Sequence, residues 1–167
     1  MNMTTITFDE FLASAKEFEH KSKELGDGWT LKEDKVDNLK TFLRKDAFVQ
    51  YENGNINHLL KVEYVIFYNL SYEVPSFSFN AWNSSGTLLT LDEIRKMSFI
   101  QINEKDFYSV ITQQEHPIFQ RPYFIMHPCH TETLLAAFKN KTKNIIVTFL
   151  GLITPLIRLN LPLEYGL

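Results

Sequence analysis

The sequence predicts an α+β fold, with an N-terminal helix, an antiparallel sheet meander and C-terminal helices. Three observations predict it: a capped amphipathic stretch at the start, a two-residue hydrophobic alternation through residues 60–72, and helical spacing after residue 131. Helix, then consecutive strands, then helices is the order of an α+β protein. Since no repeat, linker or low-complexity tract interrupts this order, we expect residues 1–167 to form a single domain.

The first helix is the clearest local prediction. Thr7 and Glu10 have the spacing of a capping box, in which each residue satisfies a backbone amide of the other. Phe11 begins a series of apolar residues at helical spacing, and Gly26 is a suitable end. We therefore expect a helix over residues 8–25.

The middle of the chain is typical of strands, at residues 29–33 and 39–51 and in two further segments. The strongest alternation places one set of residues on a common face: Leu60, Val62, Tyr64, Ile66, Tyr68, Leu70 and Tyr72. We expect Leu59 to Tyr72 and Ser76 to Asn83 to be adjacent antiparallel strands, joined by a turn at Val74-Pro75.

The remainder of the chain is predicted to be mainly helical. A short helix should run from Thr90 through Met97, and residues 123–126 could add one strand. Thr131 is a good N-cap for a helix over residues 132–140. A last apolar helix, at about residues 142–154, should be broken by Pro155.

Composition narrows the classes of function. Hydrophobic residues make up 44% of the chain and charged residues 22%, which is the balance of a globular protein. The net charge of −3 gives no basic footprint for nucleic acid or anionic lipid. One cysteine cannot form an internal disulfide. We expect the partners to be proteins or neutral molecules.

No segment has the pattern of a membrane span or a signal peptide. The longest apolar run, Ile145 to Ile157, contains two threonines and a proline, whereas a span needs about 20 apolar residues. The N-terminal residues become acidic before any apolar run develops. We therefore expect a cytoplasmic protein without an integral membrane segment.

The reactive groups concentrate at His127-Pro128-Cys129-His130-Thr131. Cys129 is the only cysteine of the chain and lies two residues before the expected N-cap. Unpaired amides and the positive end of the helix dipole favour a thiolate at such a position. Pro128 restricts His127 to an extended conformation and stiffens the approach to the thiol. The pattern indicates a reactive cysteine.

Three other interpretations of this segment stay open from the residues alone. A lone cysteine is commonly an inert, buried small hydrophobe. A metal could be held by His116, His127, Cys129 and His130, although adjacent Cys129 and His130 are awkward as joint ligands. Cys129 could also be the nucleophile of a hydrolase with a histidine base, although no Asn or Asp partner stands out.

Five segments resemble the autophagy-related protein ten family. They are Ile111-Thr112-Gln113-Gln114-Glu115-His116-Pro117-Ile118, Pro122-Tyr123-Phe124, His127-Pro128-Cys129 followed by Thr131, Ser71-Tyr72-Glu73-Val74-Pro75, and Leu159-Asn160-Leu161-Pro162-Leu163-Glu164-Tyr165. The resemblance covers about residues 58–165, and its spacing is specific.

The resemblance implies a conjugating enzyme of autophagy with a ubiquitin-conjugating-enzyme-like core. Such an enzyme accepts a ubiquitin-like protein of the autophagy protein twelve type from an activating enzyme of the autophagy protein seven type. It holds that protein as a thioester on the cysteine that corresponds to Cys129. It then transfers the protein to a lysine of an acceptor of the autophagy protein five type. These acyl transfers imply no metal and no cofactor.

One departure from conventional conjugating enzymes affects the site. Their His-Pro-Asn motif carries an asparagine where Cys129 stands here, so the usual donor to the reacting carbonyl oxygen is missing. Tyr72, at a turn that the family keeps, is one candidate replacement, or else it is only part of a strand face. His127 could hydrogen-bond the loop backbone and so set the shape of the loop, or it could assist proton transfer, and the first role is favoured.

Two other functions fit the same resemblance. One is a noncatalytic scaffold that binds the activating enzyme or the acceptor. The other is the lipid-conjugating sibling enzyme, autophagy-related protein three, which shares the His-Pro-Cys motif but is normally much longer and carries an acidic insert.

Overall fold

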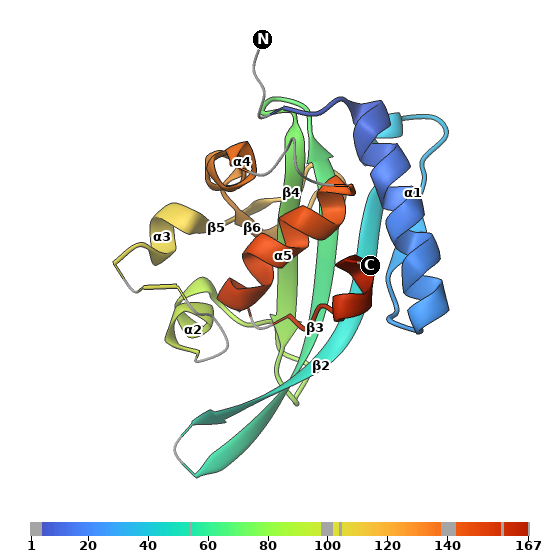
Figure 1. Ribbon diagram of the computed structural model, residues 1–167. Coiled ribbons are helices and arrows are strands. Elements are labelled where there is room, and N and C mark those ends of the chain that lie inside the picture. Colours follow the sequence, from blue (N-terminus) through green and yellow to red (C-terminus); the bar gives the residue numbers. More distant parts are fainter. Residues whose placement is uncertain are drawn as a thin grey trace.

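The computed structural model describes residues 5–53, 55–97, 102–103, 105–137, 143–157 and 159–166. Within these residues, six antiparallel strands form one sheet in the order β1-β2-β3-β4-β6-β5 (Figure 1). The strands are β1 Thr30–Lys32, β2 Phe42–Asn53, β3 Ile56–Asn69, β4 Val74–Trp82, β5 Ile111–Glu115 and β6 Pro122–Met126. The helices are α1 Phe8–Leu25, α2 Leu91–Lys96, α3 Phe107–Val110, α4 Pro128–Ala136 and α5 Ile145–Ile157, with 3-10 turns η1 Asn38–Lys40 and η3 Leu163–Gly166. The predicted α+β class and its order of elements are confirmed.

Helix α1 begins and ends where the sequence predicts. The Glu10 amide donates to Thr7 Oγ1 at 3.1 Å, and the Thr7 amide donates to Glu10 Oε1 at 3.3 Å, which completes the capping box. Gly26 ends the helix with a φ of 64°, a left-handed conformation that glycine adopts without a Cβ clash. Phe11, Ala15 and Phe18 form the buried stripe of the helix.

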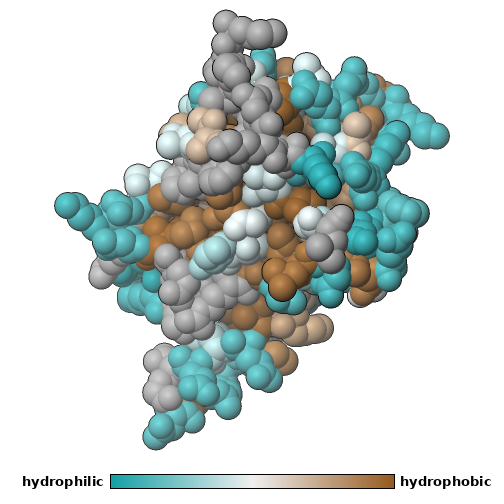
Figure 2. Space-filling model, in the orientation of Figure 1, coloured by the Kyte–Doolittle hydropathy of each residue, from teal (hydrophilic) through white to brown (hydrophobic). Residues whose placement is uncertain are grey.

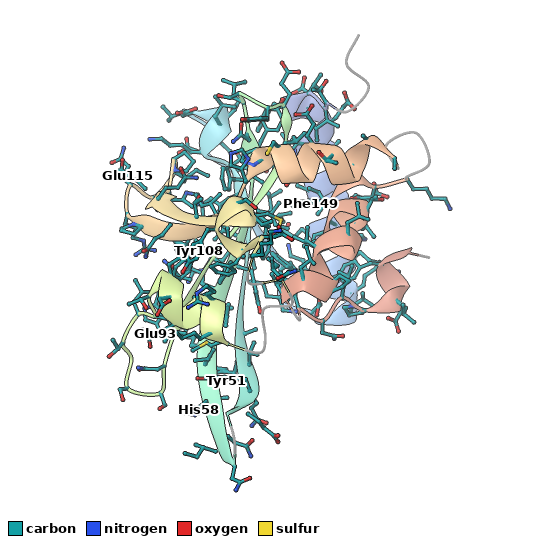
Figure 3. All side chains as sticks on the ribbon, turned by 90° about the vertical axis from the view of Figure 1, so that its left-hand side faces the viewer. Tyr51, His58, Glu93, Tyr108, Glu115 and Phe149 are labelled. Atoms are coloured by element: carbon teal, nitrogen blue, oxygen red, sulfur yellow. The ribbon has the colours of Figure 1, made fainter. Side chains whose placement is uncertain are left out.

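The sheet has two covered faces. Alternate residues of β3 lie in the main core with α1 and α5: Leu60, Val62, Tyr64, Ile66 and Tyr68. The opposite face carries a smaller cluster of Val65, Phe67, Tyr123 and Ile125, covered by Ile118 and Phe119 from the β5–β6 connection. The β2–β3 hairpin extends beyond the rest of the fold, and Tyr51 and His58 stack on it with ring centroids 4.8 Å apart (Figures 1 and 3).

The β3–β4 pairing is confirmed, but the predicted turn between these strands is displaced. Val74 and Pro75 already belong to β4, where they lie opposite Asn69 and Tyr68. The turn is formed by residues 70–73, because β3 stops at Asn69. Tyr72 therefore lies in the turn and not on a strand.

Three further expectations need correction. Helix α4 begins at Pro128 and not after Thr131, because Pro128 fits the first helical position, where no backbone N–H is needed. Helix α5 continues through Pro155 to Ile157. Helix α3 and strand β5 were not predicted, since the only regular element expected between Met97 and the last two helices was a strand at residues 123–126. Residues 138–142 of the two expected C-terminal helices lie outside the described residues.

Hydrophobic side chains gather along the middle of the molecule where α5 lies, and hydrophilic ones cover α1 and the tip of the long hairpin (Figure 2). Helix α5 buries Ile146, Phe149, Leu150 and Ile153 against the main core. Within the described ranges, no helix has the length and hydrophobicity to cross a membrane.

The C-terminal segment is fastened to α1. The Tyr165 ring stacks on Phe18 with centroids 4.7 Å apart, and its hydroxyl donates to Asp27 Oδ2 at 2.7 Å. Lys45 of β2 pairs with the same carboxylate at 2.8 Å, and both side chains of this pair are largely buried. Asp27 thus connects the C-terminal segment to the sheet.

Candidate active site

The site forms where the chain leaves β6 and enters α4. His127 is the N-cap residue with extended backbone angles, Pro128 is the first helical residue, and Cys129 is the second. Cys129 is exposed and its thiol is free. The predicted exposure of Cys129 at a loop-to-helix junction is confirmed.

The His127 side chain fixes the backbone of Cys129. Its Nδ1 accepts a hydrogen bond from the Cys129 amide at 3.2 Å, so the side chain caps the helix. Its own amide donates to the Val110 carbonyl at 2.7 Å, which ties the cap to the junction of α3 and β5. The Nδ1 lone pair of His127 is therefore engaged in capping the helix.

The turn between β3 and β4 places Tyr72 beside this cap. The Tyr72 ring meets the His127 ring edge-to-face, with centroids 6.1 Å apart and an interplanar angle of 77°. Tyr72 is 37% exposed, so its side chain is open to a ligand. The structure thus brings together the three predicted site residues, Cys129, His127 and Tyr72.

His116 lies elsewhere. It follows the end of β5 that pairs with Pro122, whereas Cys129 follows the opposite end of β6. Its neighbour Glu115 marks that distant end in Figure 3. The side chain is fully buried, with Nε2 3.0 Å from Ser78 Oγ and Nδ1 accepting from the Ile118 amide. Burial, with a smaller contribution from Arg121, lowers the pKa of His116 to about 4.

The four-residue metal set that stayed open from the sequence is therefore not assembled, since His116 does not share a site with Cys129. Across the part of the chain that the structure describes, no three His, Cys, Asp or Glu residues are grouped to hold a metal ion. The His130 side chain lies outside the described residues.

Thr131 has a different place from the one predicted. It is the fourth residue of α4 and not its N-cap, and its side chain is fully buried. Its hydroxyl has no hydrogen-bond partner among the described residues. A fully buried hydroxyl cannot reach a group bound to the exposed Cys129, so the Thr131 hydroxyl is not available to such a group.

The hydrogen bond of His127 to the Cys129 amide agrees with the favoured structural role of this histidine. Sequence reasoning missed two features, the N-cap position of His127 and the contact of its amide with Val110. The first could have been found, because proline is favoured at the first helical position and the residue before it is then the N-cap. The second has no local signal, since Val110 is 17 residues away along the chain and meets His127 only after β5 and β6 pair.

The fold and the site together define an α+β domain that presents an exposed, free thiol on the first turn of a helix. Residues 10–164 match the family described as "Autophagocytosis associated protein, active-site domain". The chain belongs to this family, in its ATG10 group.

Three relatives carry the name "Ubiquitin-like-conjugating enzyme ATG10". The Homo sapiens protein is 37% identical over 128 residues, which cover 69% of this chain and 56% of that protein. The Arabidopsis thaliana protein is 29% identical, with 61% of this chain and 51% of that protein covered. The Dictyostelium discoideum protein is 27% identical, with 61% and 52% covered. The chain spans about half the length of these relatives.

Proposed function

We propose that this chain is a single conjugating-enzyme domain that carries a ubiquitin-like protein of the autophagy protein twelve type as a thioester on Cys129. This chain receives the ubiquitin-like protein from an activating enzyme of the autophagy protein seven type. It then transfers the ubiquitin-like protein to a lysine of an acceptor of the autophagy protein five type. The exposed thiol at the start of α4 is the observation that carries the proposal. The names of the relatives support the class of activity.

Both chemical steps are acyl transfers. In the first, the Cys129 thiolate attacks the thioester carbonyl on the activating enzyme; a new carbon–sulfur bond forms and the enzyme's thiolate leaves. In the second, a lysine amine attacks the carbonyl on Cys129; a carbon–nitrogen bond forms, the carbon–sulfur bond breaks, and the amine proton passes to solvent. Neither step consumes ATP at this domain.

Each step builds negative charge on the carbonyl oxygen, which a preorganised donor stabilises. Two sources of donors surround Cys129. One is the set of remaining amides in the first turn of α4, since Pro128 has no N–H and the Cys129 amide already donates to His127. The other is the hydroxyl of Tyr72, the turn residue whose ring contacts His127. We assign the donor role to Tyr72 for the lysine step, because its ring contacts the N-cap residue and its side chain is partly exposed.

The test is loading of a Cys129→Ser variant. With activating enzyme, ATP and the ubiquitin-like protein, the wild type should form an adduct that a thiol reductant removes. The serine variant should form an oxygen ester that survives the reductant on a gel. If neither protein forms an adduct while the activating enzyme loads normally, the scaffold function is the correct one. Discharge to an aminolipid in place of a lysine would indicate the lipid-conjugating activity.

A further inference from the structure

We propose that Asn69 is a positioning residue that holds Tyr72 toward Cys129; this rests on the proposed function. Asn69 is the last residue of β3 and is half-buried. Its side-chain Oδ1 accepts from the Tyr72 amide at 2.9 Å, and its carbonyl accepts from the Glu73 amide at 2.8 Å. One residue therefore closes the turn through both its side chain and its backbone.

The last residue of the turn shows how firmly the backbone is held. Glu73 has a φ of 54°, in the left-handed region that residues with a Cβ rarely adopt. Its carbonyl accepts from the Ile6 amide at 2.8 Å, and the Ile6 carbonyl accepts from the Tyr68 hydroxyl at 2.7 Å. The strained conformation persists because these contacts fix the turn from the side of β3 and from the N-terminal segment.

The turn itself contributes little to the core. Leu70, Ser71, Tyr72 and Glu73 are all exposed. Holding an exposed turn in one strained conformation therefore gains little burial, and its clearest consequence is the direction of the Tyr72 ring. That ring lies against His127, whose Nδ1 fixes the Cys129 amide. Asn69 thus acts on the site through Tyr72.

Asn69→Ala removes the side-chain acceptor, whereas Asn69→Asp keeps an oxygen at the same place. Asn83→Ala is the matched control, because Asn83 Oδ1 accepts from the Ser85 and Thr87 amides at 3.0 Å in the turn after β4. The readout is single-turnover discharge of the preloaded domain to lysine. We expect discharge about tenfold slower in Asn69→Ala, with normal loading, and rates near wild type in Asn69→Asp and Asn83→Ala.

Two measurements separate positioning from a general loss of structure. In a Tyr72→Phe background, Asn69→Ala should slow discharge no further, because its effect passes through the Tyr72 hydroxyl. The nuclear Overhauser contact between the Tyr72 and His127 rings should persist in Asn69→Asp and vanish in Asn69→Ala. Unchanged discharge in Asn69→Ala, or the same slowing with and without the Tyr72 hydroxyl, would overturn the proposal. A wild-type domain that never loads would instead refute the proposed function itself.

Discussion

At the scale of single residues, the Tyr72 hydroxyl carries the most specific chemical expectation. Tyr72→Phe keeps the edge-to-face contact with His127 and removes only the donor. Loading of Cys129 should be unchanged, while discharge to lysine should fall about 100-fold, the usual cost of losing one oxyanion donor. Tyr108→Phe on α3, where the tyrosine is 53% exposed, controls for loss of a surface hydroxyl. Equal discharge rates in the two variants would leave the first-turn amides of α4 as the donors.

Substitutions of His127 can separate its capping role from a role in proton transfer. Asparagine is among the best N-cap residues and can accept from the Cys129 amide as Nδ1 does, but it cannot transfer protons near neutral pH. His127→Asn should therefore preserve stability, whereas His127→Ala should cost about 1 kcal/mol of unfolding free energy, as urea titration can measure. His127→Asn also removes the ring against which Tyr72 lies, so any slowing of discharge should add nothing in a Tyr72→Phe background. Additional slowing in that background would mark the ring as a proton carrier.

The lowered pKa of His116 predicts a specific pH dependence of the unfolding free energy. Its pKa falls from 6.5 to about 4 on folding, so between these values the unfolded chain binds a proton that the folded chain does not. Unfolding free energy should therefore decrease by up to about 3 kcal/mol as the pH falls through this window, and flatten below it. Urea titrations at several pH values, compared with His116→Gln, isolate this contribution. Identical pH profiles of wild type and variant would contradict it.

The same residues show what the sequence could reveal of the site. Cys129 and His127 could be found because they lie on either side of Pro128, so local rules apply. His116 was grouped with them only by residue type. Its separation depends on the pairing of β5 with β6, a long-range arrangement that carries no local pattern.

At the scale of elements, hydrophobic alternation and helix-capping residues correctly predicted the strands and helix starts that depend on them. The shared apolar face of β3 and the capping box of α1 are present where expected, and Thr90 precedes α2 as predicted. Strand β5 was missed because Gln113, Gln114 and Glu115 are exposed on an edge strand, so no hydrophobic period marks it. Helix α3 has four residues, too few for a helical period to show.

Helix α5 shows packing overriding a local rule. Ile153 and Ile157 lie on either side of Pro155 and are both buried, so ending the helix early would remove Ile157 from the core. Pro155 itself is exposed. Pro155→Ala should restore a backbone hydrogen bond in the helix. Proline also restricts the unfolded chain, which offsets part of this gain, so we expect the unfolding free energy to rise by about 1–2 kcal/mol. Urea titration checks this, and a less stable variant would mean that the helix ends before Pro155.

At the scale of the whole molecule, Tyr165 joins the C-terminal segment to α1 and, through Asp27, to Lys45 of β2. Tyr165→Phe keeps the stack on Phe18 but leaves Asp27 without this donor. We expect a loss of about 1.5–3 kcal/mol, typical of a hydrogen bond to a charged group. Thermal or urea unfolding measures it, with Tyr108→Phe as the surface control. A loss no larger than that of the control would show that the stack alone holds the segment.

The hydrogen bond between Ile6 and Glu73 also bears on how the protein can be handled. This hydrogen bond holds Ile6 beside the turn that carries Tyr72. On the proposed function, we expect a bulky affinity tag or fluorophore on the N-terminal side of Ile6 to perturb that turn and slow acyl transfer. Attachment after Tyr165 begins instead on the α1 side of the fold. Assays of acyl transfer should accordingly use C-terminal fusions, or remove an N-terminal one before measurement.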